Sequence, residues 1–362
     1  MKRLSSILVA LLFVTGMTLA QTPFNEAEVT QNGDDQTSEI TQTAKQNFAY
    51  TNQFGELNEA YVIQETGGNG FPGGKNESNI DQGSEEMGAT ENWANVFQLT
   101  NYGGGENLSN IVQDGTDNEA DVEQYTNDAD LNESNITQDV EGNDADVLQR
   151  GNYYGGSNES NITQLGITNE ADISQITNFG GENTSTVVQG SGYAEGNKAE
   201  VTQLVAKFGR TGSGTNTSEI SQFYHDNEAI VDQKILENGG TNISDIYQSR
   251  SSLGNGNFAK VKQKTKYGNS GGGGMNESDI VQKGENNEIN VGQGTNGAEH
   301  NKSDVLQEGD DNMVDVKQGT YYYAGTNISD VDQIGSSNEA YVDQRARRGG
   351  TNESIILQDG DS

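Results

Sequence analysis

Residues 107–113 read NLSNIVQ and residues 118–124 read NEADVEQ, and these two stretches decide the fold. Both follow the pattern Asn-x-(Ala/Ser)-x-(Ile/Val)-x-Gln. The fixed residues fall on alternate positions, which is the period of a β-strand with one buried face. In a helix the same residues would be scattered around the circumference. Each stretch therefore predicts a short strand whose fixed residues point inward.

The pattern recurs from one end of the sequence to the other, in about 25 copies that begin at Asn25 and end with the copy at Asn352. Copies with Ser and copies with Ala mostly alternate. Such self-similarity is typical of architectures in which each unit packs on its neighbours. In the clearest copies the predicted inward amides are Asn107, Gln113, Asn118, Gln124, Asn132, Gln138, Asn143, Gln149, Asn158, Gln164, Asn169, Gln175, Asn327, Gln333, Asn338 and Gln344. The predicted inward apolar residues of the same copies are Ile111, Val122, Ile136, Val147, Ile162, Ile173, Val331 and Val342.

The connectors between copies alternate in length. Residues 114–117, between a Ser copy and its Ala partner, read DGTD, and Gly and Asp are typical of a tight reversal. The return connector commonly has seven or eight residues and is often rich in glycine, as in residues 150–157. One unit of two strands therefore commonly spans 25 or 26 residues.

The inward amides indicate how the strands pair. A buried amide without partners costs on the order of 1–3 kcal/mol. Parallel strands stacked about 4.8 Å apart place identical amides above one another, where each can donate to one neighbour and accept from the other. An antiparallel hairpin would set Asn opposite Gln and lose this match. We therefore predict an all-β fold, a β-solenoid of about twelve stacked two-strand β-arches with a height of roughly 55–60 Å.

Composition and charge narrow the function. With 30% hydrophobic residues, 47 glycines and a net charge of −35, composition alone favours disorder, and the repeat overrides it. The negative charge disfavours nucleic acid and anionic lipid as partners and is compatible with diffuse binding of cations. There is no Cys, and His225 and His300 stand isolated in loop-like sequence. We therefore expect no enzyme, no cofactor and no dedicated metal site.

The first twenty residues are expected to be a secretory signal peptide, with Lys2 and Arg3 before an apolar stretch and a small-residue cleavage site ending at Ala20. Residues 21–362 then form one secreted repeat domain without a segment long enough for a membrane helix. The first copy follows the signal peptide directly and the last ends at Gln358. We therefore expect uncapped strand edges and head-to-tail stacking of copies into an open filament.

Residues 109–124 read SNIVQDGTDNEADVEQ and residues 134–149 read SNITQDVEGNDADVLQ. This unit resembles the curlin repeat of bacterial curli fibre subunits, Ser-x5-Gln-x-Gly-x-x-Asn-x-Ala-x3-Gln, although the first Ser-to-Gln interval is two residues shorter here. The resemblance covers essentially the whole mature chain. It implies export through a dedicated outer-membrane channel to the surface of a diderm bacterium, and assembly into functional amyloid with a nucleator subunit as partner. It also implies roles in biofilm matrix and adhesion, with the repeat Asn and Gln residues driving polymerisation.

Two alternatives stay open at this point. The chain could instead be a monomeric β-solenoid that acts as a surface adhesin or ligand-binding module. The negative charge could delay assembly, in which case acid or divalent cations should shorten the lag before fibres form, or it could serve solubility alone.

Overall fold

The structure is a computed structural model that describes residues 25–43, 46–66, 74–83, 89–101, 104–127, 131–152, 156–178, 180–190, 196–206, 214–236, 239–249, 255–266, 273–297, 299–321, 325–347 and 349–360. The expected signal peptide, residues 1–20, lies outside these residues.

Within this part of the chain there are 26 β-strands and no helix. In spatial order, sheet A contains β1 (Asn25–Asp34), β3 (Asn47–Glu56), β5 (Lys75–Gln82), β8 (Glu106–Gln113), β10 (Leu131–Gln138), β12 (Ser157–Gln164), β14 (Glu182–Gln189), β16 (Gly214–Gln222), β18 (Gly240–Ser249), β20 (Met275–Lys283), β22 (His300–Glu308), β24 (Thr326–Ile334) and β26 (Thr351–Asp359). Sheet B contains β2 (Thr37–Thr43), β4 (Glu59–Thr66), β7 (Trp93–Asn101), β9 (Glu119–Asn127), β11 (Asp144–Asn152), β13 (Glu170–Asn178), β15 (Lys198–Ala206), β17 (Glu228–Leu236), β19 (Phe258–Lys266), β21 (Glu288–Asn296), β23 (Met313–Tyr321) and β25 (Glu339–Arg347). The two-residue β6 (Ala89–Thr90) pairs with β3 beside these rows.

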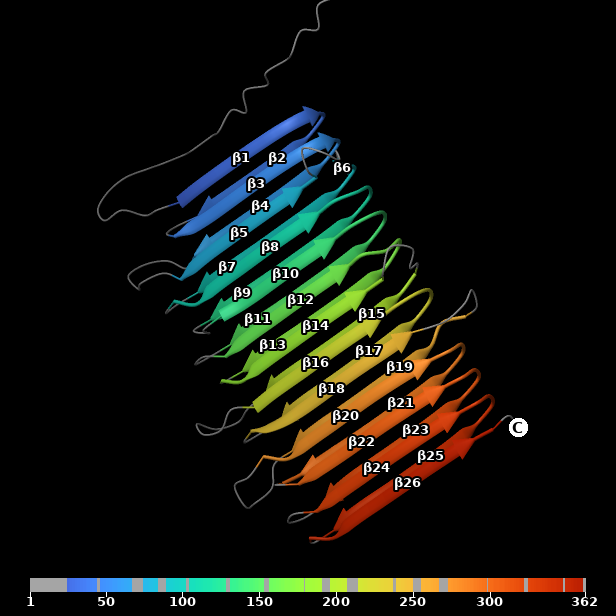
Figure 1. Ribbon diagram of the computed structural model, residues 1–362. Helices are drawn as coiled ribbons and strands as arrows, with labels where there is room; N and C mark the ends of the chain where they lie inside the picture. Colours follow the sequence, from blue (N-terminus) through green and yellow to red (C-terminus); the bar gives the residue numbers. More distant parts are fainter. Residues whose placement is uncertain are drawn as a thin grey trace, which may run out of the picture.

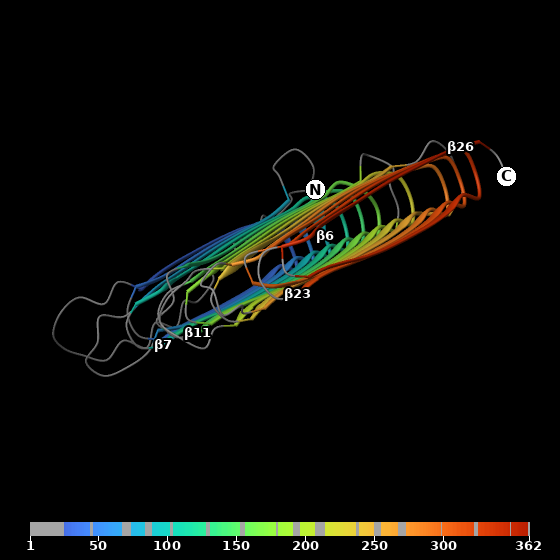
Figure 2. The same cartoon turned by 90° about the horizontal axis from the view of Figure 1, so that it is seen from below.

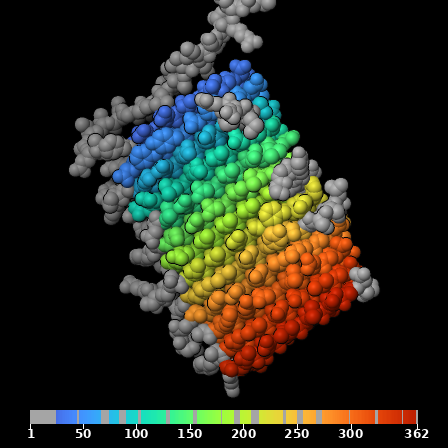
Figure 3. Space-filling model, in the orientation of Figure 1, coloured from blue at the N-terminus to red at the C-terminus, as the bar shows by residue number. Residues whose placement is uncertain are grey.

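The chain alternates between two facing sheets, adding one strand to each in turn. Apart from β6, consecutive strands lie in opposite sheets, so each pair forms an arch rather than a hairpin. Figures 1 and 2 show the result: two layers of strands joined by curved connectors, stacked in chain order from the blue N-terminal strands to the red C-terminal strands. The predicted all-β solenoid is confirmed. Figure 3 shows its surface as parallel rows of side chains whose colours follow the sequence without interruption.

Strand pairing is parallel and in register, so that like residues stack. Ser134 in β10 pairs with Ser109 in β8 and with Ser160 in β12. In sheet B, Ala145 in β11 pairs in the same way with Ala120 in β9 and Ala171 in β13. The register follows from the motif, because a slip by one residue would turn the whole inward set outward.

The strands of the two sheets alternate in height along the solenoid axis. The side-chain amide of Gln138, in β10, donates to the backbone carbonyl of Glu119 in β9, 2.7 Å away. It also donates to the carbonyl of Asn143, the residue before β11, 3.0 Å away. A sheet A strand therefore lies between two sheet B strands, and the chain climbs by half a strand spacing from each strand to the next.

The core is a thin layer of small and β-branched side chains between the sheets. Most strands of each sheet contribute one small residue and one β-branched residue, which suits β-strands that pack closely face to face. All the predicted inward apolar residues are buried, with exposed fractions of 5% or less: Ile111, Val122, Ile136, Val147, Ile162, Ile173, Val331 and Val342.

The short connectors also stack. Thr116, between β8 and β9, bridges to Thr90 and to Glu141 of the neighbouring turns. Gly115 has φ = +102°, and a Cβ atom there would lie 1.8 Å from the carbonyl oxygen of Val140 in the next connector. This close approach of backbone to backbone accounts for glycine at that position.

One histidine differs from its expected setting. His225 lies in the connector between β16 and β17, as expected, but His300 begins β22. Its Nε2 atom is 3.6 Å from a carboxylate oxygen of Glu277 on the neighbouring β20. Its sequence looked loop-like because a glycine-rich stretch precedes it.

Candidate functional site: the buried amide ladders

Glutamine ladders run the length of both sheets. In sheet A, Nε2 of Gln113 donates to Oε1 of Gln138 at 2.9 Å, and Nε2 of Gln138 donates to Oε1 of Gln164 at 2.9 Å. In sheet B, Nε2 of Gln124 donates to Oε1 of Gln149 at 2.8 Å. Each amide donates to the strand that follows it in its sheet, so every glutamine ladder has a direction.

Backbone carbonyls of the facing sheet set that direction. Nε2 of Gln113 also donates to the carbonyl oxygens of Trp93 and Asn118, 2.9 and 3.0 Å away. Nε2 of Gln124 donates to the carbonyl of Leu108, 2.8 Å away. A flipped amide would place its oxygen against these carbonyl oxygens. The nitrogen is therefore held on that side, and the amide is satisfied on both of its polar atoms.

Asparagine ladders run in the opposite direction. In sheet A, Nδ2 of Asn132 donates to Oδ1 of Asn107, 3.0 Å away on the preceding strand. Beside sheet B, both the backbone N–H and Nδ2 of Asn143 donate to Oδ1 of Asn118 at 3.1 Å. The asparagines thus donate backward along the chain, whereas the glutamines donate forward.

All the predicted inward amides belong to these ladders. Fourteen of them are 0–1% exposed: Asn107, Gln113, Asn118, Gln124, Asn132, Gln138, Asn143, Gln149, Asn158, Gln164, Asn169, Gln175, Asn327 and Gln333. Gln344 is 7% exposed and Asn338 is half-buried, because both lie near the C-terminal end of the stack. Their predicted role in polymerisation is a separate matter, taken up below.

One further inward row escaped the sequence analysis. From β4 onward, the sheet B strands continue beyond the glutamine, and the residue two positions later is also buried. At seven strands it is a buried threonine: Thr66, Thr100, Thr126, Thr177, Thr265, Thr295 and Thr320. In two cases the hydroxyl contacts an asparagine ladder: Oγ1 of Thr265 donates to Oδ1 of Asn242 at 2.9 Å, and Oγ1 of Thr177 accepts from Nδ2 of Asn158 at 3.5 Å. The signal was present as a continued alternation after Gln in the Ala copies.

The end strands leave both kinds of ladder open. Among the described strands, β1 and β2 pair only with β3 and β4, and β25 and β26 pair only with β23 and β24. At the first turn, Gln31 and Gln42 donate to the next strand, and their Oε1 atoms accept from no described residue. At the last turn, Nε2 of Gln358 donates only to the carbonyl of Glu339 within the described chain. The Oδ1 atom of Asn352 receives no hydrogen bond from the described residues.

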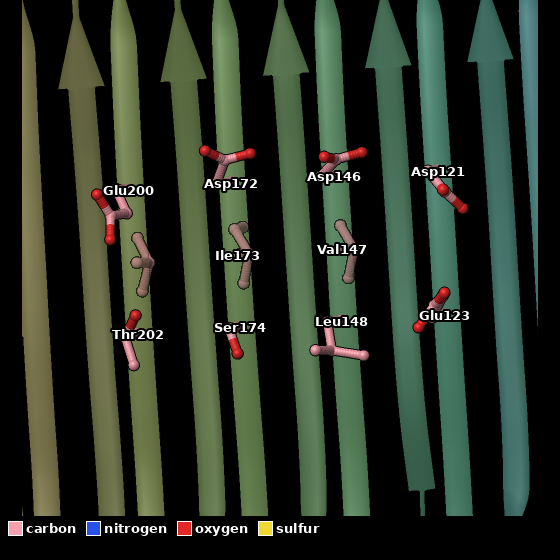
Figure 4. A pocket seen from close by; sticks show the side chains of 11 residues that line it. Asp121, Glu123, Asp146, Val147, Leu148, Asp172, Ile173, Ser174, Glu200 and Thr202 are labelled. Carbon is pink, nitrogen blue, oxygen red and sulfur yellow. The ribbon is translucent and has the colours of Figure 1, made fainter.

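The outer face of sheet B carries an acidic groove. Asp121, Asp146, Asp172 and Glu200 stand in register on β9, β11, β13 and β15, above the floor residue Ile173 and its neighbours. Figure 4 shows these carboxylates side by side on adjacent strands. Burial raises the pKa of Asp121 to about 6, and the Asp146 and Glu123 carboxylates add to the effect.

Neighbouring acids on this face are shifted in the same direction. Burial raises the pKa of Asp144 to about 6, with Asp146 and Glu119 as further causes. The pKa values of Asp146 and Asp172 are also raised, first by burial and then by Glu170. The groove is therefore a row of crowded carboxylates that binds protons more readily than isolated acids do.

The described residues contain no group of three or more His, Cys, Asp or Glu side chains arranged to hold a metal ion. A search of the same residues for helices long and apolar enough to cross a membrane found none. Comparison of the chain with protein-family models gave no match, and comparison with the curated proteins gave none either. The arrangement that remains as a candidate site is the pair of open stack ends with their directional amide ladders.

Proposed function

We propose that this protein is a secreted structural subunit whose copies stack end to end into extracellular amyloid-type fibres, as the resemblance to curlin repeats implies. A β-solenoid repeat fold is consistent with a structural or adhesin-like protein. The finer statement, polymerisation, rests on the two ends of the stack.

The observation that carries the proposal is the direction of the ladders. At the last turn, glutamine Nε2 atoms have a hydrogen to give and asparagine Oδ1 atoms can accept. At the first turn, the Oε1 atoms of Gln31 and Gln42 can accept a hydrogen bond. The Oδ1 atom of Asn25 accepts from the backbone N–H of Asn47, and its Nδ2 atom donates to none of the described residues, so it can donate to another copy. The two ends are therefore complementary, as donor to acceptor for glutamine and as acceptor to donor for asparagine.

This complementarity selects head-to-tail stacking. Two first turns facing each other would bring glutamine oxygen against glutamine oxygen, and two last turns would bring nitrogen against nitrogen. At Gln42, Gln344 and Gln358, a backbone carbonyl of the facing sheet accepts from Nε2 and so opposes a flip of the amide. A head-to-tail contact is heterologous, so each added copy presents a new open end and the assembly grows without closing.

The same contact supplies backbone pairing. The end strands run parallel to their neighbours: β1 and its partner β3 each have ten residues, and β26 and its partner β24 each have nine. An open strand edge of this kind is a template for another strand. Each junction would extend both the backbone ladders and the inward amide ladders of a dry core, which is the arrangement that makes cross-β assemblies stable.

The remaining parts of the proposal come from the sequence. Residues 1–20 have the features of a signal peptide, and the curlin-like repeats imply an outer-membrane export channel, a nucleator subunit and roles in biofilm matrix and adhesion. Self-association makes a second copy of this chain the principal partner.

The test is growth of fibres by the purified mature chain. We expect concentration-dependent thioflavin fluorescence after a lag, fibres by electron microscopy, and a reflection near 4.8 Å in diffraction from aligned fibres. Sonicated fibres should remove the lag. A folded chain that stays monomeric at high concentration would contradict the proposal and would favour the adhesin-like alternative.

A matched pair of variants tests the role of the open ends. Gln358→Glu keeps an acceptor for the preceding Gln333 but removes the donor that faces the next copy. We expect this variant to fold and its fibres to elongate at least about tenfold more slowly. A tenfold effect corresponds to a loss of about 1.4 kcal/mol of binding free energy at the junction. Glu353→Gln, an exposed substitution on the same strand, serves as the control and should not slow elongation.

A further inference from the structure

The two sheets differ by one strand at the C-terminal end of the described stack. Sheet A ends with β26, whereas sheet B ends with β25, which precedes β26 along the axis. Because the strands of the two sheets alternate in height, the next vacant position above β26 belongs to sheet B. At the other end, the first strand of the stack, β1, belongs to sheet A.

We propose that successive copies in the fibre are related by half a turn about the fibre axis, so that β1 of the next copy continues sheet B on β25 and β2 continues sheet A on β26. This inference rests on the proposed end-to-end assembly and specifies its junction. The half-turn keeps strands parallel, because the two sheets run in opposite directions and a half-turn about the axis maps one onto the other (Figure 1).

The inward residues of the first turn support this exchange. Sheet B strands from β4 onward mostly carry Ala and then Val at the two core positions, whereas sheet A strands from β5 onward mostly carry Ser and then Ile. The first turn has the reverse assignment. In sheet A, β1 carries Ala27 and Val29; in sheet B, β2 carries Ser38 and Ile40.

Within its own chain the first turn is matched in sheet A, where Ala27 stacks on Ala49, but mismatched in sheet B. There, Ser38 stacks on Ala60 and Ile40 stacks on Val62. After a half-turn, Ala27 would stack on Ala340 of β25 and Ser38 would stack on Ser354 of β26. The Ala row and the Ser row would both continue across the junction, and so would the Val and Ile rows.

The amide ladders also continue in this arrangement. Nε2 of Gln344 would donate to Oε1 of Gln31 of the next copy, and Nε2 of Gln358 would donate to Oε1 of its Gln42. In the isolated chain Gln344 already donates one hydrogen to the carbonyl of Ile328 and has the second available. The Oδ1 atom of Asn338, which accepts from none of the described residues, would accept from Asn25.

Direct stacking without the half-turn is less favourable. It would place β1 on β26 and satisfy Asn352 with Asn25, but β2 would then lie two strand spacings, about 9.6 Å, from β25. One sheet B position would be vacant at every junction, and buried backbone groups would lose their partners at a cost of about 1–3 kcal/mol each. Ser354 would also stack on Ala27 rather than on a serine.

Disulfide trapping separates the two arrangements, because the chain has no native cysteine. Leu357 on β26 would lie beside Thr41 of the next copy after a half-turn and beside Thr30 under direct stacking. All three side chains are exposed on the outer faces, so cysteines there should leave the fold intact. Adjacent in-register strands hold Cα atoms about 4.8 Å apart, within the range a disulfide spans.

We expect fibres of the double variant Leu357→Cys/Thr41→Cys to yield covalent multimers on oxidation, and fibres of Leu357→Cys/Thr30→Cys to yield none. The opposite result would overturn the half-turn and leave end-to-end assembly standing. Fibres that trap neither pair would also overturn it. If neither variant nor the parent chain forms fibres, end-to-end assembly itself fails and the half-turn with it.

Image reconstruction of the fibres gives a second readout that needs no substitution. Successive molecules should be related by a rise of about 60 Å and by half a turn added to the twist of the solenoid itself. A relation by the solenoid twist alone would contradict the proposal.

Discussion

The middle turns and the end turns of this solenoid carry the same motif in different surroundings. Gln138 and Ile136 in β10 are 0% exposed, whereas Gln358 and Ile356 in β26 are half-buried. A middle strand has a neighbour on each side, and an end strand has one. The same residues therefore hold the fold together in the middle of the stack and are available for association at its ends.

Substitution of one glycine in the middle of the stack and one at its end should give the largest difference in the free energy of unfolding. Gly115 and Gly360 both have positive φ, at +102° and +139°. A Cβ at Gly115 would clash with the Val140 carbonyl, whereas a Cβ at Gly360 meets nothing within 4 Å. We expect Gly115→Ala to lower the free energy of unfolding by at least about 4 kcal/mol and Gly360→Ala by about 1 kcal/mol, the strain of the backbone alone. Chemical denaturation of the monomer measures both, and equal losses would contradict the stacking of the short connectors.

The glutamine ladder gives the next contrast. Gln138→Leu would remove four hydrogen bonds: the ladder bonds with Gln113 and Gln164, and the bonds to the backbone carbonyls of Glu119 and Asn143. We expect a loss of about 3 kcal/mol or more in the free energy of unfolding. Gln358→Leu, at the end, should cost less than about 1 kcal/mol in the monomer but should slow fibre elongation. A ladder that contributed only to assembly would instead leave the stability of Gln138→Leu unchanged.

Acidification should stabilise the middle of sheet B. Asp121 and Asp144 have pKa values near 6 in the folded chain, above the value of about 3.9 for an unfolded Asp. Between these values the folded state binds more protons, so the free energy of unfolding rises as pH falls from 7 toward 4. We expect a gain of about 1 kcal/mol per group after allowing for solvent screening. Denaturation at pH 7 and pH 5 measures the gain, and Asp121→Asn should reduce it; stability that falls over this range would contradict the assignment.

The serine row should give the smallest contrast. Among others, Ser160 has a hydroxyl that is buried without a hydrogen-bond partner. We expect Ser160→Ala to raise the free energy of unfolding by about 0.5–1 kcal/mol. Ser354→Ala, on the half-buried β26, should leave it unchanged. Thermal unfolding of the two variants compares them, and a loss of stability in Ser160→Ala would indicate that the hydroxyl has a partner.

Most of the fold followed from local pattern, because alternation alone assigns Asn107, Ile111 and their equivalents to one face. Because the same residues recur in every copy, parallel pairing of equivalent strands was favoured over hairpins. The parallel register of Ser109, Ser134 and Ser160 confirms this pairing.

The direction of the amide ladders could not be predicted in this way. It depends on backbone carbonyls of the facing sheet, such as those of Trp93 and Leu108, which accept from the glutamine amides. These carbonyls are within reach because the strands of the two sheets are offset by half a strand spacing along the axis. The extra inward threonines, Thr126 among them, were missed because the motif was taken to end at Gln. The strand setting of His300 was missed because glycine-rich sequence before it suggested a loop.

The identity of successive units also bears on how such a chain changes in length. Each pair of strands offers the same core residues to the pair before and to the pair after, so recombination that removes or duplicates one whole unit joins surfaces that already fit. Longer and shorter descendants could thus arise in single genetic steps, with glycine-rich connectors absorbing imprecise joints. A gain or loss of one strand would exchange the Ala and Ser rows and is the step that selection should remove.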